Sequence, residues 1–209
     1  MQLNSGKFIV VEGLEGAGKS SVIATIVEQI RQQGFQVKQT REPGGTPLAE
    51  ALRECVKQTW QETVTTETEL MLMYAARSQL IANVIAPALH AGQWVVGDRH
   101  DLSSLAYQGG GRGVARELID VIRGVTLRGF KPDLTLYLDV EPEVGLARAR
   151  GRGELDRIEQ EDVEFFHRVR NAYLQEANAD DSVIVIDAMQ SMPEVHSAVV
   201  AQLNNVFEA

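Results

Sequence analysis

Hydrophobic residues along the chain fall into two kinds of segment. Short, nearly continuous apolar runs rich in β-branched residues predict the buried strands of a parallel sheet at 8–13, 94–98, 134–140 and 182–187. A more polar run at 35–40 predicts a fifth strand. Elsewhere apolar residues recur every three or four positions and predict helices over 20–33, 67–91, 114–128, 159–178 and 192–207. Pro87 predicts a bend in the second of these helices, because proline has no N–H to donate within it.

The alternation of strands and helices predicts an α/β fold, in which a five-stranded parallel sheet is flanked by helices on both faces. The 209-residue chain shows no repeat, low-complexity tract or linker, so we expect one domain over residues 1–209. The basic stretch "ARARGRGELDR" at 147–157 is interrupted by Gly151 and Gly153 and predicts a mobile loop.

Composition narrows the range of partners. The formal net charge is −9, which disfavours general binding to nucleic acids or anionic membranes. Cys55 is the single cysteine, so the sequence predicts no internal disulfide. The sequence contains no segment that resembles a signal peptide or a membrane span. We therefore expect a cytoplasmic protein without nucleic-acid or membrane partners, whose basic residues gather locally if it binds polyphosphate.

The stretch "GLEGAGKS" has the spacing of a P-loop, G-x-x-x-x-G-K-S. Glycines let the backbone amides approach phosphate oxygens, and the N-terminus of the following helix favours negative charge. Lys19 is expected to bridge the β- and γ-phosphates, and the Ser20 hydroxyl to bind Mg²⁺. The alternative of a chance glycine-rich turn is disfavoured because a strand precedes the motif and an amphipathic helix follows it. The candidate nucleotide-binding residues are Gly13, Leu14, Glu15, Gly16, Ala17, Gly18, Lys19 and Ser20.

A magnesium site at a P-loop also needs a carboxylate at the end of a neighbouring strand. Asp98, which follows the apolar run of "WVVGDR", is the favoured second metal ligand beside Ser20. An aspartate at a strand end can equally form a turn or cap a helix. Asp139 in "LYLDV" is the other candidate, and the sequence alone does not choose between them in space.

Several motifs together resemble the bacterial thymidylate kinases. "FIVVEGLEGAGKS", "TREPGGTPLAEALR", "MYAAR", "GDRHDLSSLAYQGGGR", "PDLTLYLDV" and "RGELDRIEQED" follow one another in the order and spacing of that family, from residue 8 to about 190. The resemblance implies a P-loop NTPase fold, phosphoryl transfer from ATP with Mg²⁺ to dTMP in dTTP synthesis, and a homodimer. The stripe of Leu118, Val121, Ile122 and Val125 is either core or a dimer face. A kinase for another nucleoside monophosphate, or a nucleotide-binding switch ATPase, is the alternative.

The resemblance also implies roles at the acceptor site. Arg53 and Arg99 hold the acceptor phosphate, with Arg99 counted among the catalytic residues together with Lys19 and Asp98. Other residues of the family contact the nucleoside: Arg77, Ser104 and Gln108 at the base, Tyr107 at the sugar, Glu12 or Glu15 at the 3′-hydroxyl, and Pro43 in the pocket wall.

One position departs from the family pattern. Met73 stands where a phenylalanine often stacks on thymine, and Tyr74 is adjacent. A methionine can pack on a ring through its polarizable sulfur. The sequence leaves open which of the two forms the base platform.

The basic loop at about 147–158 resembles the lid of bacterial members. Gly16 occupies the P-loop position where other members carry an arginine, so the lid is expected to supply the positive charge. Arg152 and Arg157 are the candidate catalytic arginines near the phosphates, and Arg148 and Arg150 are candidate ATP-binding residues, with Arg150 near adenine. A solvated loop balanced by its own acidic residues is the alternative.

Overall fold

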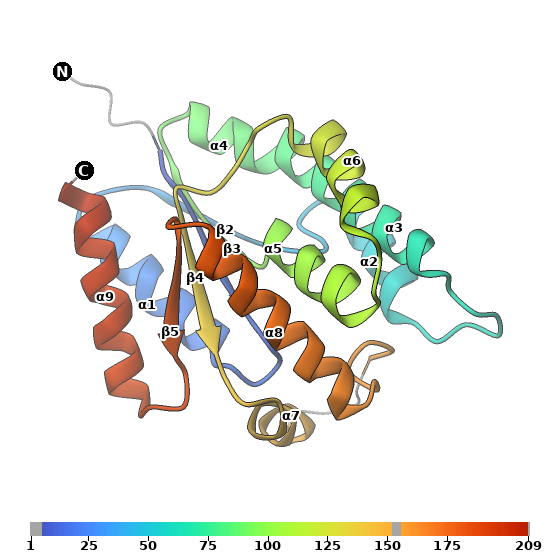
Figure 1. Cartoon of the computed structure of the whole chain (residues 1–209). Coiled ribbons are helices and arrows are strands. Elements are labelled where there is room, and N and C mark those ends of the chain that lie inside the picture. Colours follow the sequence, from blue (N-terminus) through green and yellow to red (C-terminus); the bar gives the residue numbers. More distant parts are fainter. Residues whose placement is uncertain (1–5, 152–155, 209) are drawn as a thin grey trace.

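Five parallel strands form the centre of the computed structural model, which describes residues 6–151 and 156–208. The strands are β1 (Phe8–Gly13), β2 (Val37–Arg41), β3 (Trp94–Asp98), β4 (Leu134–Asp139) and β5 (Val183–Asp187). Their order is β2-β3-β1-β4-β5 (Figure 1). All five expected strands are therefore confirmed. Since the strand order reverses at β1, the carboxyl ends of β1 and β3 border the crevice where ligands of such sheets bind.

Strand β1 is buried on both faces, as its continuous apolar run predicts. Ile9 and Val11 pack toward α1 (Lys19–Gln32), which with α9 (Met192–Glu208) covers one face of the sheet. Phe8 and Val10 pack on the opposite face, against Leu80 and Ile85. That face is covered by α3 (Thr66–Leu80), η1 (Ile81–Ile85), α4 (Ala86–His90), α5 (Asp101–Ser104), η2 (Leu105–Gly111) and α8 (Val163–Ala179). Both faces of the sheet are thus flanked by helices, as expected.

Two turns of wider, π-type winding interrupt the helices on this second face. The first, η1, precedes α4, and its position agrees with the bend expected near Pro87. The second, η2, carries Tyr107 and Gln108 and packs against α8. Gly110 and Gly111 permit this packing, since a Cβ on Gly110 would lie 2.5 Å from the Cβ of Ala172. The glycine run after "AYQ" therefore brings η2 close to α8.

Three helices lie outside these layers or at their ends. α2 (Pro47–Lys57) and α6 (Arg116–Leu127) pack on α3, and α7 (Pro142–Arg150) follows β4 at the carboxyl end of the sheet. The stripe predicted on α6 divides: Leu118, Val121 and Val125 are exposed, whereas Ile122 is partly buried and packs on the cluster that contains the buried Ile119. Of the helices in the described ranges, none is long and apolar enough to span a bilayer.

The expected loop at 147–158 needs a correction. Residues 147–150 form the last turn of α7, and the helix ends at the C-cap Gly151. The helix continues because Leu146 and Ala149 pack inward while Arg148 and Arg150 face solvent. Only the part after Arg150 is compatible with a loop, and 152–155 lie outside the described residues.

Candidate functional site

The P-loop joins β1 to α1 in a single tight turn. Gly16 has φ +78°, and a Cβ there would lie 2.1 Å from the carbonyl oxygen of Gly145 in α7. A larger residue at this position would collide with α7. Gly18 has φ +93° and precedes α1 without any side-chain cap in the described chain. The helix N-terminus is therefore left to an anion.

Lys19 begins α1 and lies against the loop. Its Nζ donates to the carbonyl oxygens of Gly13 at 3.1 Å and Leu14 at 3.0 Å. Burial and the nearby Arg99 guanidinium lower the pKa of Lys19 to about 8, although Asp98 and Glu15 oppose them. The ammonium lines a cavity of about 390 Å³ together with Gly18, Ser20, Asp98 and Arg99. A phosphate bound there would raise the pKa of Lys19 back toward its ordinary value, because an adjacent anion favours the ammonium form.

The carboxylate needed for a metal ion is best supplied by Asp98. It ends β3, lines the same cavity as Ser20, and its buried Oδ1 has no hydrogen-bond partner among the described residues. Asp139, the other candidate, accepts from Nε and Nη2 of Arg170, at 2.8 and 2.9 Å. No group of three or more metal-ligating side chains occurs in the described ranges. Ser20 and Asp98 therefore suit a hard cation such as Mg²⁺, which takes most of its ligands from phosphate and water.

Arg99 connects the elements around the cavity. It has φ +68°, directly after β3, and its guanidinium donates to Glu15, Ser103, Tyr107 and Tyr173. Burial raises the pKa of Glu15, but Arg99 and Lys19 outweigh burial and hold that pKa below its ordinary value. Glu15 is thus a carboxylate that neutralises Arg99 in this structure.

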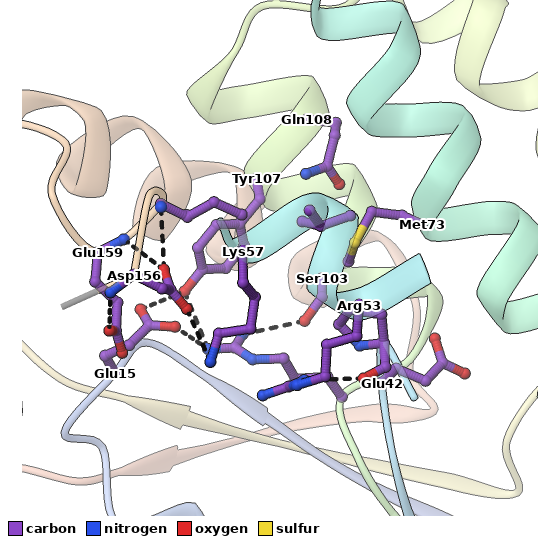
Figure 2. Close-up of a pocket in the computed structure, with 14 residues that line it drawn as sticks. Glu15, Glu42, Arg53, Lys57, Met73, Ser103, Tyr107, Gln108, Asp156 and Glu159 are labelled. Carbon is purple, nitrogen blue, oxygen red and sulfur yellow. Dashed lines mark hydrogen bonds and ion pairs between the residues drawn. The ribbon is translucent and has the colours of Figure 1, made fainter. Parts of the chain in front are cut away.

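A second cavity of about 150 Å³ adjoins the first. Figure 2 shows Gln108 and Met73 on one side of it and Glu15 and Glu159 on the other, with Tyr107 reaching Glu15 through its hydroxyl. Arg53 lines both cavities and donates to the Pro43 carbonyl at 2.9 Å. Five residues line both cavities: Glu15, Glu42, Arg53, Arg99 and Glu159. The P-loop cavity and the second cavity therefore meet at two arginines.

The structure separates the two candidates for the base platform. Met73 lines the second cavity. Tyr74 points elsewhere: its hydroxyl donates to Asp101 Oδ1 at 2.8 Å, and Arg77 lies 4.5 Å from its ring centroid. In this structure Met73 alone of the pair faces the cavity.

Arg77 and Ser104 are wholly buried and lie behind the second cavity rather than among its lining residues. Arg77 donates to Glu42 Oε2 at 2.7 Å, to the His100 carbonyl at 2.9 Å and to Ser104 Oγ at 3.0 Å. Its Nη1 has no hydrogen-bond partner in the described chain and lies 3.7 Å from Asp101 Oδ1. Arg77 therefore has one N–H donor group, Nη1, that is available for a further hydrogen bond, and its guanidinium lies next to Glu42 in the cavity wall.

The structure also distinguishes Glu12 from Glu15. Glu12 is fully buried, accepts from the His100 N–H at 2.8 Å and from the hydroxyls of Ser103 and Tyr173, and has a pKa raised by burial. It lines neither of the two cavities, whereas Glu15 lines both. Of the two acids, Glu15 is the one within reach of a ligand.

The four arginines expected in the lid are dispersed. Arg148 Nη1 lies 3.4 Å from the carbonyl oxygens of Gly16 and Ala188, beside the P-loop, and Arg150 is exposed at the end of α7. Arg152 lies outside the described residues. Arg157 differs from the expectation that it lies near the phosphates, since its Nη2 donates to Glu69 at 2.6 Å and its Nε to the Val56 carbonyl at 3.0 Å. The buried Glu69 carboxylate holds it there.

Several residues of the site escape a reading of the sequence. Ser103, and not its neighbour Ser104, lines the second cavity. Glu42 and Glu159 also line both cavities, although the sequence indicated only residues close to them, Pro43 and Arg157, as candidates. Glu69 lies outside the cavity lining and accepts a hydrogen bond from Gln108. Its position four residues before Met73, on the same face of one helix, is the signal that could have indicated it.

Comparison with known proteins agrees with this geometry. A profile of the family described as "Thymidylate kinase" matches residues 11–199. The thymidylate kinase of Alteromonas mediterranea is 66% identical over 96% of this chain and 90% of its own length. That of Idiomarina loihiensis is 62% identical over 93% of this chain and 95% of its own. That of Colwellia psychrerythraea is 60% identical over 94% of this chain and 93% of its own length. With a P-loop at β1 and two cavities that meet at Arg53 and Arg99, the chain belongs to the thymidylate kinase family.

Proposed function

We propose that the protein transfers the γ-phosphoryl group of ATP to the phosphate of dTMP, giving dTDP and ADP. One observation carries the proposal: a cavity at the P-loop adjoins a second cavity, and Arg53 and Arg99 line both. A phosphate held between them would contact donor and acceptor sites at once. Family membership supports the same reaction.

At the donor side, the loop amides of Gly13, Leu14, Glu15, Gly16, Ala17 and Gly18 and the N-terminus of α1 would surround the ATP phosphates. The Lys19 ammonium would neutralise charge on the β- and γ-phosphates. Ser20 and Asp98 would hold Mg²⁺, and the unpartnered Oδ1 of Asp98 fits this role. When bound, the ion would act as a Lewis acid that stabilises the negative charge on the oxygens of the transferred phosphoryl group.

At the acceptor side, Arg99 and Arg53 would hold the dTMP phosphate as forked donors. The attacking phosphate oxygen is already anionic near neutral pH, so no strong general base is needed. Catalysis then consists of alignment and of charge stabilisation. Glu15 occupies Arg99 in this structure, so the acceptor phosphate would compete with Glu15 for that guanidinium.

The nucleoside would lie in the second cavity. Met73 would pack on the thymine ring, Tyr107 would border the sugar, and Pro43 would form part of the wall. Gln108 would face the base edge. Arg77 would use its unpartnered Nη1 toward the thymine carbonyl, with Ser104 holding the same guanidinium. Glu12 would act indirectly, through Ser103, and Tyr74 would support Arg77.

Arg152 remains our candidate for the lid arginine that reaches the transferring group, with Arg148 and Arg150 on the ATP side. We propose that Arg157 contributes by anchoring the segment that follows the lid on Glu69. Arg152→Ala tests this assignment: turnover should fall by about two or more orders of magnitude, because the variant loses a positive charge at the transferring group. Near-normal turnover would remove Arg152 from the reaction.

The exposed stripe of α6 supports a homodimer. Val121 and Val125 are 66% and 69% exposed, and Leu118 adjoins them. Such a patch is costly to leave in water. Light scattering of the wild type and of Val121→Glu should give a dimer and a smaller species, respectively. A cytoplasmic location and the absence of nucleic-acid partners stay predictions from the sequence.

The decisive experiment is ADP formation from ATP and Mg²⁺ with dTMP, dUMP, dCMP, AMP, GMP, thymidine or no acceptor, with products identified by chromatography. Rapid dTDP formation with dTMP and little turnover with the purine nucleotides is the expected result. A preference for AMP or GMP would leave the P-loop assignment and overturn the base site. Turnover that ignores every acceptor would overturn phosphoryl transfer itself.

A further inference from the structure

A buried carboxylate lies directly behind the base end of the second cavity. Glu69, in the first turn of α3, is 2% exposed. Its Oε1 accepts from Gln108 Nε2 at 2.9 Å and from Arg112 Nε at 3.3 Å, and its Oε2 accepts from Arg157 Nη2 at 2.6 Å. Three donors thus fix this side chain, two from η2 and its C-cap and one, Arg157, from a distant segment.

Glu69 remains ionised in these surroundings. Burial raises its pKa, but the hydrogen bond from Gln108 and the charge of Arg112 outweigh burial and hold the pKa below its ordinary value. An ionised carboxylate only accepts hydrogen bonds. Whatever faces Glu69 must therefore be a donor.

This requirement decides the orientation of the Gln108 amide. A glutamine amide is nearly symmetric in shape, with a donor NH₂ and an acceptor oxygen that can exchange places. Beside Glu69 the NH₂ must face the carboxylate, because two facing oxygens would repel. The amide oxygen is then left over: Oε1 of Gln108 is buried and has no hydrogen-bond partner within the described residues. Gln108 itself lines the second cavity, on the same side as Met73 (Figure 2).

A fixed acceptor at this point distinguishes pyrimidines. Thymine and uracil carry a hydrogen on ring nitrogen N3, whereas neutral cytosine carries a lone pair there. Arg77, the other polar group assigned to the base, is a donor in any rotamer. Gln108, in contrast, can either donate or accept, and in the opposite orientation its NH₂ group would donate to cytosine N3.

We propose that Glu69 is a specificity-determining positioning residue: it locks the Gln108 amide with its oxygen toward the base, so that the site accepts the N3–H of thymine or uracil and rejects cytosine. The inference rests on the proposed function, since it concerns the acceptor of that reaction. A site built to pair a substrate N–H discriminates strongly, because a wrong substrate leaves a buried polar group unpaired.

The test compares Glu69→Gln with the wild type, using kcat/KM for dTMP, dCMP and dUMP. The substituted amide keeps the shape of the carboxylate but also offers a donor, so Gln108 is free to turn. The ratio of kcat/KM for dTMP over dCMP should fall at least about 10-fold, the effect of one hydrogen bond. The ratio for dTMP over dUMP should not change, because both bases carry N3–H. A merely loosened pocket would change both ratios.

Glu161→Gln is the matched control. It also removes a carboxylate charge from Arg112, which donates to Glu161 Oε1 at 2.5 Å, but Glu161 has no hydrogen bond to Gln108. The dTMP-over-dCMP ratio of this variant should equal that of the wild type. Thermal unfolding of both variants shows whether each is folded.

Glu69→Asp serves if Glu69→Gln does not fold. The shorter side chain keeps its charge for Arg112 and Arg157 but withdraws from Gln108, so the ratio should again fall. A wild-type preference for dTMP that persists in the folded Glu69 variant overturns the inference and leaves the proposed function intact. A wild type that does not phosphorylate dTMP at all overturns the proposed function, and the inference with it.

Discussion

The phosphate end and the base end of the cleft are built in different ways. The phosphate end is centred on eight consecutive residues, 13–20, in one turn between β1 and α1, and Asp98 and Arg99 at the end of β3 lie beside them. The base end combines α2, α3, η2 and the segment from Asp156 to Glu159. The comparison teaches that a motif of fixed spacing can specify a site for a common group, phosphate, whereas a site for a particular base depends on contacts between distant segments.

The two ends also differ in how their charges are paired. Near the P-loop, Lys19 is bonded only to backbone carbonyls among the described residues, and Asp98 has a free oxygen. Behind the base end, Glu42 pairs with Arg77 and Glu69 with Arg112. The phosphate end is arranged for ligands, and the base end for rigidity. Substitutions should therefore affect turnover at the first and stability or selectivity at the second.

Lys19→Ala should give the largest effect. We expect turnover to fall by two or more orders of magnitude with little change in the thermal midpoint, because the ammonium acts on transferred charge. Steady-state kinetics with dTMP and ATP measure the first quantity, and a thermal melt the second. Exposed Lys38→Ala is the control for loss of one positive charge. A variant that kept near-normal turnover would place the donor phosphates elsewhere.

Glu42→Gln should show the opposite balance. It weakens the buried pair with Arg77, and we expect the free energy of unfolding to fall by about 2 kcal/mol at pH 7. Arg77 and His100 hold the pKa of Glu42 below its ordinary value despite burial, so this stability is present above about pH 4.5 and is lost as the pH falls through the folded-state pKa. Urea unfolding of both proteins between pH 3 and 7 measures the difference. Equal loss at every pH would mean that the charge of Glu42 is not involved.

Two glycine substitutions compare the ends directly. In Gly16→Ala the new Cβ would meet the Gly145 carbonyl, and in Gly110→Ala it would lie 2.5 Å from the Cβ of Ala172. Overpacking of this kind costs about 1–3 kcal/mol of folding free energy and shifts the local backbone. Gly16 lines the P-loop cavity, and Gly110 lies in η2 with Tyr107 and Gln108, so we expect each shift to weaken the adjacent site and raise KM by about 10-fold or more. The rise should concern ATP in Gly16→Ala and dTMP in Gly110→Ala. Equal effects on both substrates in both variants would contradict the separation of the two ends.

The same contrast explains what could be predicted from sequence. The five strands follow from apolar runs, and Gly16 and Lys19 follow from motif spacing, because both are local properties. Packing between distant segments decides two other features: Arg157 binds Glu69, and Met73 rather than Tyr74 faces the cavity. The stripe of Val121 and Val125 has a helical period whether it faces the core or the solvent. Periodicity therefore identifies the apolar face of a helix but does not show whether that face packs on the core or on another molecule.

Gly124→Ala should give the smallest effect and a rise in stability. Gly124 is exposed within α6, and an added Cβ there would meet no described atom within 4 Å beyond its chain neighbours and the backbone of its own helix. Alanine favours the helix over the unfolded chain, so the free energy of unfolding should increase by about 0.5–1 kcal/mol. Urea unfolding measures this change, and kinetics with ATP and dTMP should match the wild type. Because α6 contributes no residue to either cavity, altered kinetics would mean that α6 influences the site through the contact it makes with α3.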